Sequence, residues 1–373
     1  MKETLRYLAG LAGPSGYGSN STAEQVTEDC SLPSQLTAII TGATSGIGAE
    51  TARVMAKRGV RVIIPARDLK KAGEMKERIQ KESPKAEVIV LEIDLSSFAS
   101  IKRFCSEFLS LGLPLHILIN NAGKFSHKLE FSEDKIEMSF ATNYLELLIE
   151  KMVETAAQTG IQGRIINVSS VIHSWVKRDG FRFNQMLNPK NYNGTRAYAQ
   201  SKLANILHAK ELARQLKARN ARVTINAVHP GIVKTGIIRD HKGFITGKNS
   251  SFIHNFRKKK NGREEKRRRV KTNDMFMNMC CRFSVFHSIK ATKIDLSGGG
   301  GADVFVGGWA QGASTTCYVG LSRKTEGVSG KYYADCNECS CSSMANDESE
   351  AHNLWRQSRA LIHRRLRLPA AAA

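Results

Sequence analysis

The sequence predicts an α/β protein with a doubly wound parallel sheet. Its hydrophobic periodicity switches repeatedly between short β-branched runs and longer helical patterns. The first short run, 36–40, leads through a glycine-rich turn directly into a helical pattern. Strands that alternate with helices are typical of parallel strands joined by crossover helices. We therefore expect one domain with helices on both faces of its sheet.

The residues that follow each strand are the first candidates for a functional site. In doubly wound sheets, ligands bind outside the carboxyl ends of the strands. The expected strands are 36–40, 60–64, 87–92, 115–120, 164–168, 222–228 and 331–334. The expected helices are 47–58, 69–82, 97–111, 133–158 and 196–218.

The composition indicates a globular protein of a reducing compartment. The chain has 373 residues, of which 41% are hydrophobic, enough to fill a sizeable core. No window of about eighteen apolar residues exists, so we expect no membrane-spanning helix. The start, 1–11, lacks a secretory pattern, whereas chloroplast or mitochondrial targeting stays open. The eight cysteines do not form a secreted disulfide framework.

Three of these cysteines, Cys336, Cys339 and Cys341, have a spacing that suits thiolate ligands of zinc. Four ligands are normally needed, and no second cysteine pair or histidine lies at a suitable interval. We therefore expect ordinary thiols and no metal site.

The net charge of +22 is unevenly distributed. Residues 248–310 hold fourteen Lys or Arg against five Asp or Glu. This basic segment has no sustained periodicity, so we expect a disordered loop inserted in the domain. Nucleic-acid or nuclear-targeting contact is the alternative, which is disfavoured because aromatic residues hardly interleave with the charge.

The glycine-rich turn predicts a Rossmann-type dinucleotide site. Glycines allow a tight turn and close approach of the backbone to a pyrophosphate, and the helix N-terminus attracts phosphate. A glycine-rich connection without a ligand is the alternative. The candidate cofactor contacts in this turn are Gly42, Thr44, Ser45, Gly46, Ile47 and Gly48.

Residues after the next strands suggest which dinucleotide binds. Arg67 stands where an acidic residue would hold the ribose of NAD, so a cation can meet a 2′-phosphate, which favours NADP. Asp68 fits a helix cap better. Asp94, with Leu95 after it, can accept from the adenine amino group or cap the next helix.

Small and amide-bearing residues end the fourth strand. Such residues suit a turn against a cofactor, and a purely structural turn is the alternative. The candidate contacts here are Asn121, Ala122 and Gly123.

Tyr198 and Lys202 are four residues apart and share one face of a helix. A fixed ammonium beside a phenol favours the phenolate and lowers its pKa from about 10. Such a tyrosine can give a proton to a substrate oxygen or take one from it. A surface pair is the alternative, since this spacing also arises by chance.

Together these residues resemble the short-chain dehydrogenase/reductase superfamily over about 36–335, apart from the insertion. Within it, 13–27 and 169–175 resemble the plant retinol-dehydrogenase-like branch, which includes the dehydrogenase-like subunit of the chloroplast inner-envelope translocon. The motifs that carry the resemblance are 41–48, 120–123, Asn143, Ser169 with Ser170, 198–202 and 229–235.

The resemblance implies an NADP-dependent oxidoreductase that interconverts a carbonyl and an alcohol by hydride transfer. Tyr198 would act as general acid/base, and Ser170, the second serine of its pair, would bind the substrate oxygen. Lys202 would lower the pKa of the tyrosine and bind the ribose hydroxyls, while Asn143 would hold a water for proton exchange. The residues expected at the nicotinamide end are Pro230, Gly231, Val233 and Thr235.

The chain departs from the family pattern in two segments. After Leu145 it has about six residues fewer, which changes the faces of any helix that follows. The basic insertion 248–310 replaces a shorter apolar segment over the substrate. A retained intron or mis-joined exon would explain both. The alternative function is therefore an NADPH-binding, catalytically weak regulatory or redox-sensing subunit of a chloroplast translocon.

The expected division is an N-terminal extension (1–35), the dehydrogenase domain (36–345) and a basic amphipathic C-terminal segment (346–373). The last segment could bind calmodulin or an anionic membrane, or pack its apolar stripe on the domain. The resemblance implies a chloroplast location, peripheral to the inner envelope, and otherwise the chain would be cytoplasmic. Translocon partners are implied with it, and the oligomeric state stays open.

Overall fold

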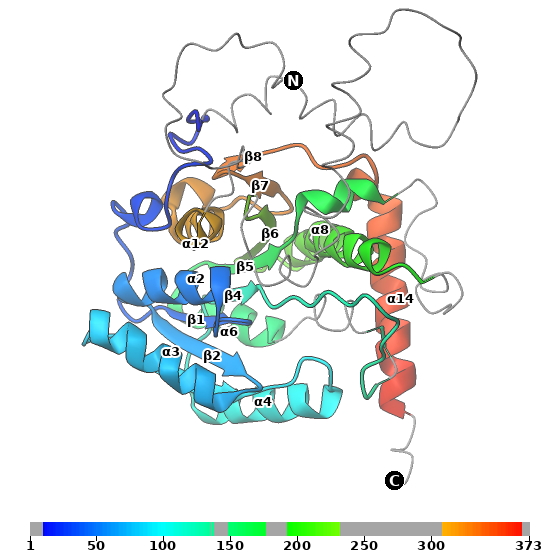
Figure 1. The fold of residues 1–373 in the computed structure, drawn as a ribbon, viewed down its shortest axis with the longest axis horizontal. Helices are drawn as coiled ribbons and strands as arrows, with labels where there is room; N and C mark the ends of the chain where they lie inside the picture. The colour runs from blue at the N-terminus through cyan, green and yellow to red at the C-terminus, as the bar shows by residue number, and fades with distance from the viewer. Residues whose placement is uncertain (1–9, 135, 138–147, 177–191, 232–307, 368–373) are drawn as a thin grey trace, which may run out of the picture.

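One eight-stranded sheet organises the protein in the computed structural model (Figure 1). The structure describes residues 10–134, 136–137, 148–176, 192–231 and 308–367, without the side chains of 361–367. The strand order is β3-β2-β1-β4-β5-β6-β7-β8. Neighbouring strands are parallel except β7 and β8, which are antiparallel. The predicted doubly wound sheet is confirmed.

The strands lie within two residues of their expected ends, apart from β8, which the sequence did not predict. The strands are β1 (Thr37–Ile40), β2 (Arg61–Ala66), β3 (Val88–Glu92), β4 (Ile117–Asn120), β5 (Gly163–Val168), β6 (Val223–His229), β7 (Tyr332–Ala334) and β8 (Asn337–Glu338). The α-helices are α2 (Gly46–Lys57), α3 (Leu69–Glu82), α4 (Phe98–Ser110), α6 (Ile149–Thr159), α8 (Gly194–Ala218), α12 (Trp309–Gly312), α13 (Ser314–Leu321) and α14 (Glu348–Arg367). Short 3₁₀ helices are η1 (Gln25–Thr27), η2 (Val171–Trp175), η5 (Arg323–Thr325) and η6 (Met344–Asn346).

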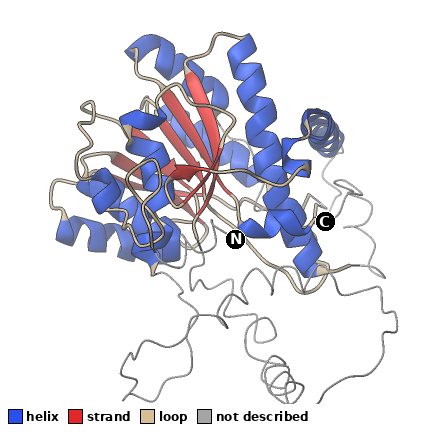
Figure 2. Cartoon of the chain, turned by 90° about the horizontal axis from the view of Figure 1, so that it is seen from above, coloured by secondary structure: helices blue, strands red, loops and turns tan. Residues whose placement is uncertain are grey.

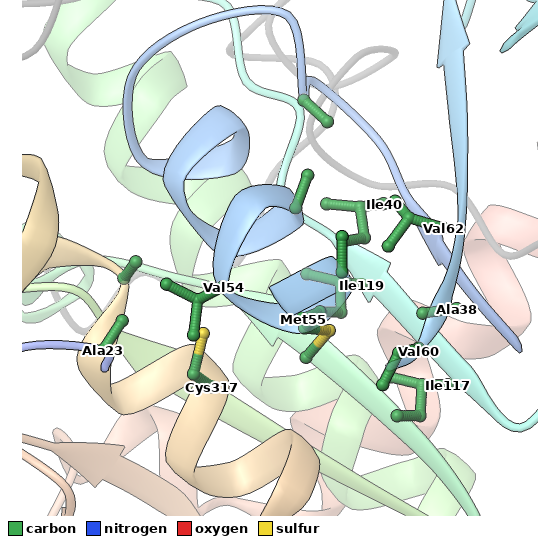
Figure 3. Close-up of a cluster of buried hydrophobic side chains, with 14 of the residues drawn as sticks. Ala23, Ala38, Ile40, Val54, Met55, Val60, Val62, Ile117, Ile119 and Cys317 are labelled. Carbon is green, nitrogen blue, oxygen red and sulfur yellow. The ribbon is translucent and has the colours of Figure 1, made fainter. Parts of the chain in front are cut away.

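Helices cover both faces of the sheet (Figure 2). Successive strand residues point to opposite faces, so Ile40 and Ile39 of β1 belong to different core clusters. One cluster joins the sheet to α2, α3 and α13, where Met55 and Cys317 are fully buried (Figure 3). The other joins it to α4, α6, α8 and α14. This double burial explains why the strands are almost continuously apolar.

Residues 10–35 pack against the same domain. Ala23 is fully buried, and the carboxylate of Glu24 lies 2.6 Å from Arg53 of α2. At the other edge of the sheet, the side chain of Asn337 donates to the carbonyl of Tyr17 at 3.0 Å. The described part of the expected N-terminal extension is therefore packed on the domain.

Of the helix expected over 133–158, the described residues show only the part from Ile149. Phe131 and Glu137 form an antiparallel bridge, and a carboxylate oxygen of Asp134 accepts from the main-chain N–H of Phe98 at 2.6 Å. Asp134 thereby accepts from one of the main-chain N–H groups that have no partner within α4, and it does not start a helix. Among the described residues α6 starts at Ile149, directly after Leu148, which has a left-handed φ of +61°.

The C-terminal helix α14 packs on α8. Leu354 is buried, and the ring of Trp355 stacks on His208 with centroids 5.8 Å apart. Nδ1 of His352 lies 3.3 Å from the buried carboxylate of Glu211. Of the alternatives for this segment, packing on the domain is therefore the one seen up to residue 360. Calmodulin or a membrane would have to compete with α8 for these apolar side chains.

Part of the expected features lies outside the described residues. These are Asn143, Val233, Thr235 and 248–307 of the insertion. Within the described ranges, no helix has the length and apolar character that a membrane span needs. The same ranges contain no group of three or more His, Cys, Asp or Glu suited to a metal ion.

His208 should make the fold sensitive to acid. It is 2% exposed, and its Nδ1 lies 3.0 Å from the side-chain nitrogen of Asn167. Burial lowers its pKa to about 3, so it stays neutral in the fold while an unfolded histidine protonates below about 6.5. Stability present above pH 6.5 is lost toward pH 3, by about 1.4 kcal/mol per pH unit.

The measurement is urea unfolding at pH 7 and pH 5. His208→Asn, which keeps an acceptor for Asn167, should lose less stability than the wild type between these pH values, by about 2 kcal/mol. His127→Gln, a change at an exposed histidine, is the control and should behave like the wild type. Equal losses in all three proteins would contradict the assignment.

Candidate active site

The turn between β1 and α2 requires glycine at two positions. Gly42 has φ +67°, and a Cβ there would lie 2.8 Å from Cα of Ala122. A Cβ on Gly48 would lie 2.3 Å from the carbonyl oxygen of Gly42. Both contacts are with backbone, so neither can be relieved by a side-chain movement. Ser45, the N-cap of α2, makes no side-chain cap bond, which leaves the first helical N–H groups available to an anion.

Thr41 and Asn121 join this turn to the end of β4. The hydroxyl of Thr41 accepts from the main-chain N–H groups of Asn121 and Ala122, each at 3.0 Å. In return, the side-chain nitrogen of Asn121 donates to the carbonyls of Thr41 at 2.9 Å and Gly42 at 3.3 Å. β1 and β4 are the neighbours at which the strand order reverses, so these bonds fix the place where doubly wound sheets bind ligands.

The other candidate contacts of the turn differ in exposure. Ile47 and Gly48 are buried, Thr44 and Gly46 are half-buried, and Ser45 is exposed. Gly46 has φ +59° with open space around it. The exposed and half-buried positions form the outer side of the turn, where a phosphate can approach.

Arg67 and Asp68 follow β2 and have different roles. Asp68 is the N-cap of α3 and accepts from the main-chain N–H of Lys71 at 3.1 Å, as expected for a cap. Its bond and ion pair with Lys71 lower the pKa of this carboxyl. Arg67 is exposed and makes no hydrogen bond or ion pair with any residue that the structure describes. Its guanidinium is therefore available to a ligand.

Asp94, after β3, closes its own loop. One carboxylate oxygen accepts from the N–H and the hydroxyl of Ser96, at 2.9 and 2.7 Å. Ser97, rather than Asp94, is the N-cap of α4. The capping alternative for Asp94 is therefore wrong, although a local turn takes its place. Leu95 lies beside it, half-buried against the core.

Tyr198 and Lys202 meet on the inner side of α8. The ammonium of Lys202 lies 5.5 Å from the ring centroid of Tyr198 and donates to the carbonyl of Val168 at 3.0 Å. The side chain of Asn205 donates to the same carbonyl, also at 3.0 Å. Lys202 is 3% exposed, so the alternative of a surface pair is wrong.

Burial dominates the protonation of this pair. It raises the pKa of Tyr198 to about 12 and lowers the pKa of Lys202 to about 8. The expected lowering of the pKa of the tyrosine by the lysine is therefore wrong for the protein without a cofactor. The ring of Phe125 adds to the apolar surroundings of Tyr198, with centroids 5.8 Å apart. At neutral pH Tyr198 is protonated, which suits a proton donor.

The two serines after β5 have different partners. Ser169 is 2% exposed, and its hydroxyl donates to the carbonyl of Lys202 at 2.7 Å. Ser170 is half-buried at the N-cap of η2, where its hydroxyl oxygen accepts a long bond of 3.4 Å from the N–H of Ile172. Its hydroxyl proton is given to no described residue, which agrees with the preference for Ser170 as the ligand of a substrate.

These groups share one edge of the sheet. Asn121, Ala122 and Gly123 follow β4, Ser170 follows β5, and Pro230 with Gly231 follows β6. Strands β4, β5 and β6 are parallel neighbours, so their carboxyl ends lie side by side. Gly231 has φ +79°, a conformation that favours glycine.

Sequence reasoning gave no individual role to three residues that shape the site. Thr41 opens the glycine-rich turn, Asn205 stands one helical turn after Lys202, and Phe125 follows Gly123 closely. A hydroxyl before the first glycine was the available signal for Thr41. No local pattern indicated the contact of Phe125 with Tyr198, which depends on the fold.

Comparison with known proteins agrees with this geometry. Residues 36–179 match the family model described as short chain dehydrogenase. The short-chain dehydrogenase TIC 32 B, chloroplastic, of Brassica napus is 39% identical over 359 residues, covering 95% of this chain and 96% of the relative. This chain belongs to the short-chain dehydrogenase family. Retinol dehydrogenase 12 of Bos taurus is 33% identical, covering 87% of this chain and 85% of the relative.

A solved structure supports the fold of this short-chain dehydrogenase. An actinorhodin polyketide ketoreductase crystallised with NADPH superposes with a TM-score of 0.53 at 20% identity. The match covers 84% of this chain and 98% of the ketoreductase chain. The predicted membership of an oxidoreductase family that uses NAD(P)(H) is confirmed.

Gly48→Ala should weaken cofactor binding. The added methyl group meets the carbonyl of Gly42, so the turn must widen where a pyrophosphate would lie. We expect the Kd for NADPH, measured by fluorescence titration, to rise about tenfold or more. Gly73→Ala in α3, where a Cβ meets nothing within 4 Å, is the matched control. It should leave the Kd unchanged, and an unchanged Kd in Gly48→Ala would contradict the role of the turn.

Proposed function

We propose that this protein is an NADP(H)-dependent oxidoreductase that interconverts a carbonyl and an alcohol, with Tyr198 as general acid/base. The observation that carries the proposal is the contact of half-buried Tyr198 with the buried ammonium of Lys202 on α8. Ser170, which follows β5, donates its hydroxyl proton to no residue that the structure describes. The glycine-rich turn at the same edge of the sheet supports a dinucleotide there. The proposed cofactor contacts are those named from the sequence.

In the reducing direction, Ser170 donates a hydrogen bond to the carbonyl oxygen of the substrate and Tyr198 gives that oxygen its proton. The bound cofactor supplies the hydride that reaches the carbonyl carbon. Charge on the oxygen grows as the hydride arrives, so both hydroxyls bind the transition state more strongly than the ground state. At neutral pH Tyr198 carries the proton that this step transfers.

Lys202 contributes a positive charge next to the tyrosine. With a pKa lowered to about 8 it is mostly charged at neutral pH, and it stabilises the phenolate that Tyr198 becomes after giving its proton. Two further donors on its ammonium remain for ribose hydroxyls beside the bond to Val168. Asn143 is proposed to hold the water that returns the proton, and Val233 and Thr235 to contact the nicotinamide end.

A second candidate is a catalytically weak, NADPH-binding regulatory subunit of a chloroplast translocon. Relatives of 39% identity are named TIC 32, chloroplastic, which supports the proposed chloroplast location. The position at the inner envelope is proposed from the resemblance alone. The left-handed Leu148 directly before α6 is the described feature that accords with a changed helix after Leu145. Calmodulin or an anionic membrane remains a proposed partner of the C-terminal segment beyond Ser358.

Tyr198→Phe should abolish turnover and spare NADPH binding. The change removes only the hydroxyl that delivers the proton, so kcat for aldehyde reduction should fall by about a thousandfold. The assay follows NADPH absorbance over a panel of aldehydes and ketones, with Kd measured in parallel. Tyr333→Phe, a buried tyrosine of β7, is the control that should keep wild-type turnover. Retained activity in Tyr198→Phe would contradict the role of Tyr198 as general acid/base. If the wild type binds NADPH but reduces no substrate, the second candidate is favoured.

Arg67→Ala should reduce the preference for NADP. Removal of this guanidinium, which pairs with no described residue, takes away the partner of a 2′-phosphate. The Kd for NADPH should therefore rise about tenfold while that for NADH stays unchanged. Lys70→Ala, an exposed cation of α3, is the matched control. A parallel rise for both cofactors would contradict a role in reading the phosphate.

A further inference from the structure

His173 is a buried histidine whose two ring nitrogens both have partners. It lies in η2, three residues after Ser170, and is 3% exposed. We propose that His173 is a positioning residue, which holds Ser170 in place by fixing its main-chain carbonyl to the loop 341–346. The proposal rests on the function proposed above and deepens the role of Ser170 in it.

The contacts of His173 determine its protonation state. Nδ1 lies 2.7 Å from the carbonyl oxygen of Ser170, which only accepts, so Nδ1 carries the proton. Nε2 lies 3.2 Å from the main-chain nitrogen of Ser342, which only donates, so Nε2 is the acceptor. One neutral tautomer satisfies both bonds. A protonated ring would lose the bond to Ser342.

The surroundings favour this neutral form. Burial lowers the pKa of His173 and outweighs the opposite effect of the bond to Ser170. The ring of His173 and that of Tyr332 of β7 form an edge-to-face contact, with centroids 5.1 Å apart. Since the side chain has almost no exposure, water cannot replace a lost partner, and each bond is expensive to break.

The loop 341–346, whose Ser342 donates to Nε2 of His173, is itself anchored to α8. The hydroxyl of Ser342 accepts from the N–H of Ala345 at 3.3 Å, and its carbonyl accepts from the N–H of Asn346 at 3.2 Å. The ammonium of Lys210 donates to the side chain of Asn346 at 2.8 Å. Lys210 and Tyr198 both belong to α8. Through this loop, His173 therefore connects Ser170 to the helix that carries the proton donor.

Ser170 needs such a support because its own side chain is weakly held. The bond from Ile172 to its hydroxyl is 3.4 Å long, whereas its carbonyl accepts from both Nδ1 and the main-chain N–H of His173, the latter at 3.1 Å. On its other side, Ser169 is fixed to Lys202 and to Val228, each at 2.7 Å. The position of the Ser170 hydroxyl is therefore determined mainly by these contacts of the main chain.

Two conservative variants distinguish the effects of the two hydrogen bonds that the ring of His173 makes. In His173→Asn, the amide nitrogen takes the place of Nδ1 and keeps the bond to Ser170. In His173→Gln, the amide oxygen takes the place of Nε2 and keeps the bond to Ser342. Each variant loses one buried bond, so a structural role alone predicts similar losses of Tm and similar kcat. A positioning role predicts that kcat falls only where the bond to Ser170 is lost.

The experiment measures kcat, KM, the Kd for NADPH and Tm of the full chain with an aldehyde that the wild type reduces. We expect His173→Gln to lower kcat about tenfold or more, with an unchanged Kd for NADPH, and His173→Asn to stay within about threefold of the wild type. In a Ser170→Ala background, His173→Gln should cause no further loss of kcat.

Equal kcat values in the two variants, or an undiminished loss in the Ser170→Ala background, would overturn the positioning role while leaving the proposed function intact. Absence of wild-type turnover, or an unchanged kcat in Ser170→Ala, would instead overturn the proposed role of Ser170 and this inference with it.

Discussion

The bond from the Lys202 ammonium to the carbonyl of Val168 is the contact on which the site depends. It ties α8 to the end of β5 at 3.0 Å, and Asn205 donates to the same carbonyl. Without a partner, a buried ammonium would cost several kcal/mol. The return contact from Ser169 to the carbonyl of Lys202 closes the connection. Tyr198 and Ser170 therefore keep their relative position although they belong to different elements.

Burial and charge act against each other in this site. Burial strengthens the bond of the Lys202 ammonium to Val168. The same burial raises the pKa of Tyr198 and lowers that of Lys202. The free protein thus holds a proton on the tyrosine at neutral pH, the state that a proton donor needs. The proposal for His173 follows the same logic, since a buried neutral ring with two committed nitrogens fixes Ser170 without adding charge.

Local signals in the sequence were enough for the sheet and the glycine-rich turn. β-branched runs predicted the strands, and Gly42 and Gly48 stand where a side chain would collide with backbone. Contacts between distant segments were not predictable in this way. Asp134 serves α4 instead of starting a helix, Phe125 packs on Tyr198, and the bond between Ser342 and His173 joins residues 169 positions apart. The wrong sign for the pKa of the tyrosine has the same origin, because burial is a property of the fold.

We propose that this short-chain dehydrogenase delivers a hydride to the carbonyl carbon and a proton to the carbonyl oxygen of its substrate at the Tyr198 site. The most direct test is incubation with NADPH deuterated at the transferable C4 position and an aldehyde, followed by mass spectrometry of the product. We expect an alcohol that carries one deuterium on its carbinol carbon. Unchanged aldehyde in the presence of tightly bound NADPH would contradict the proposed reaction and support a regulatory protein that binds the cofactor without chemistry.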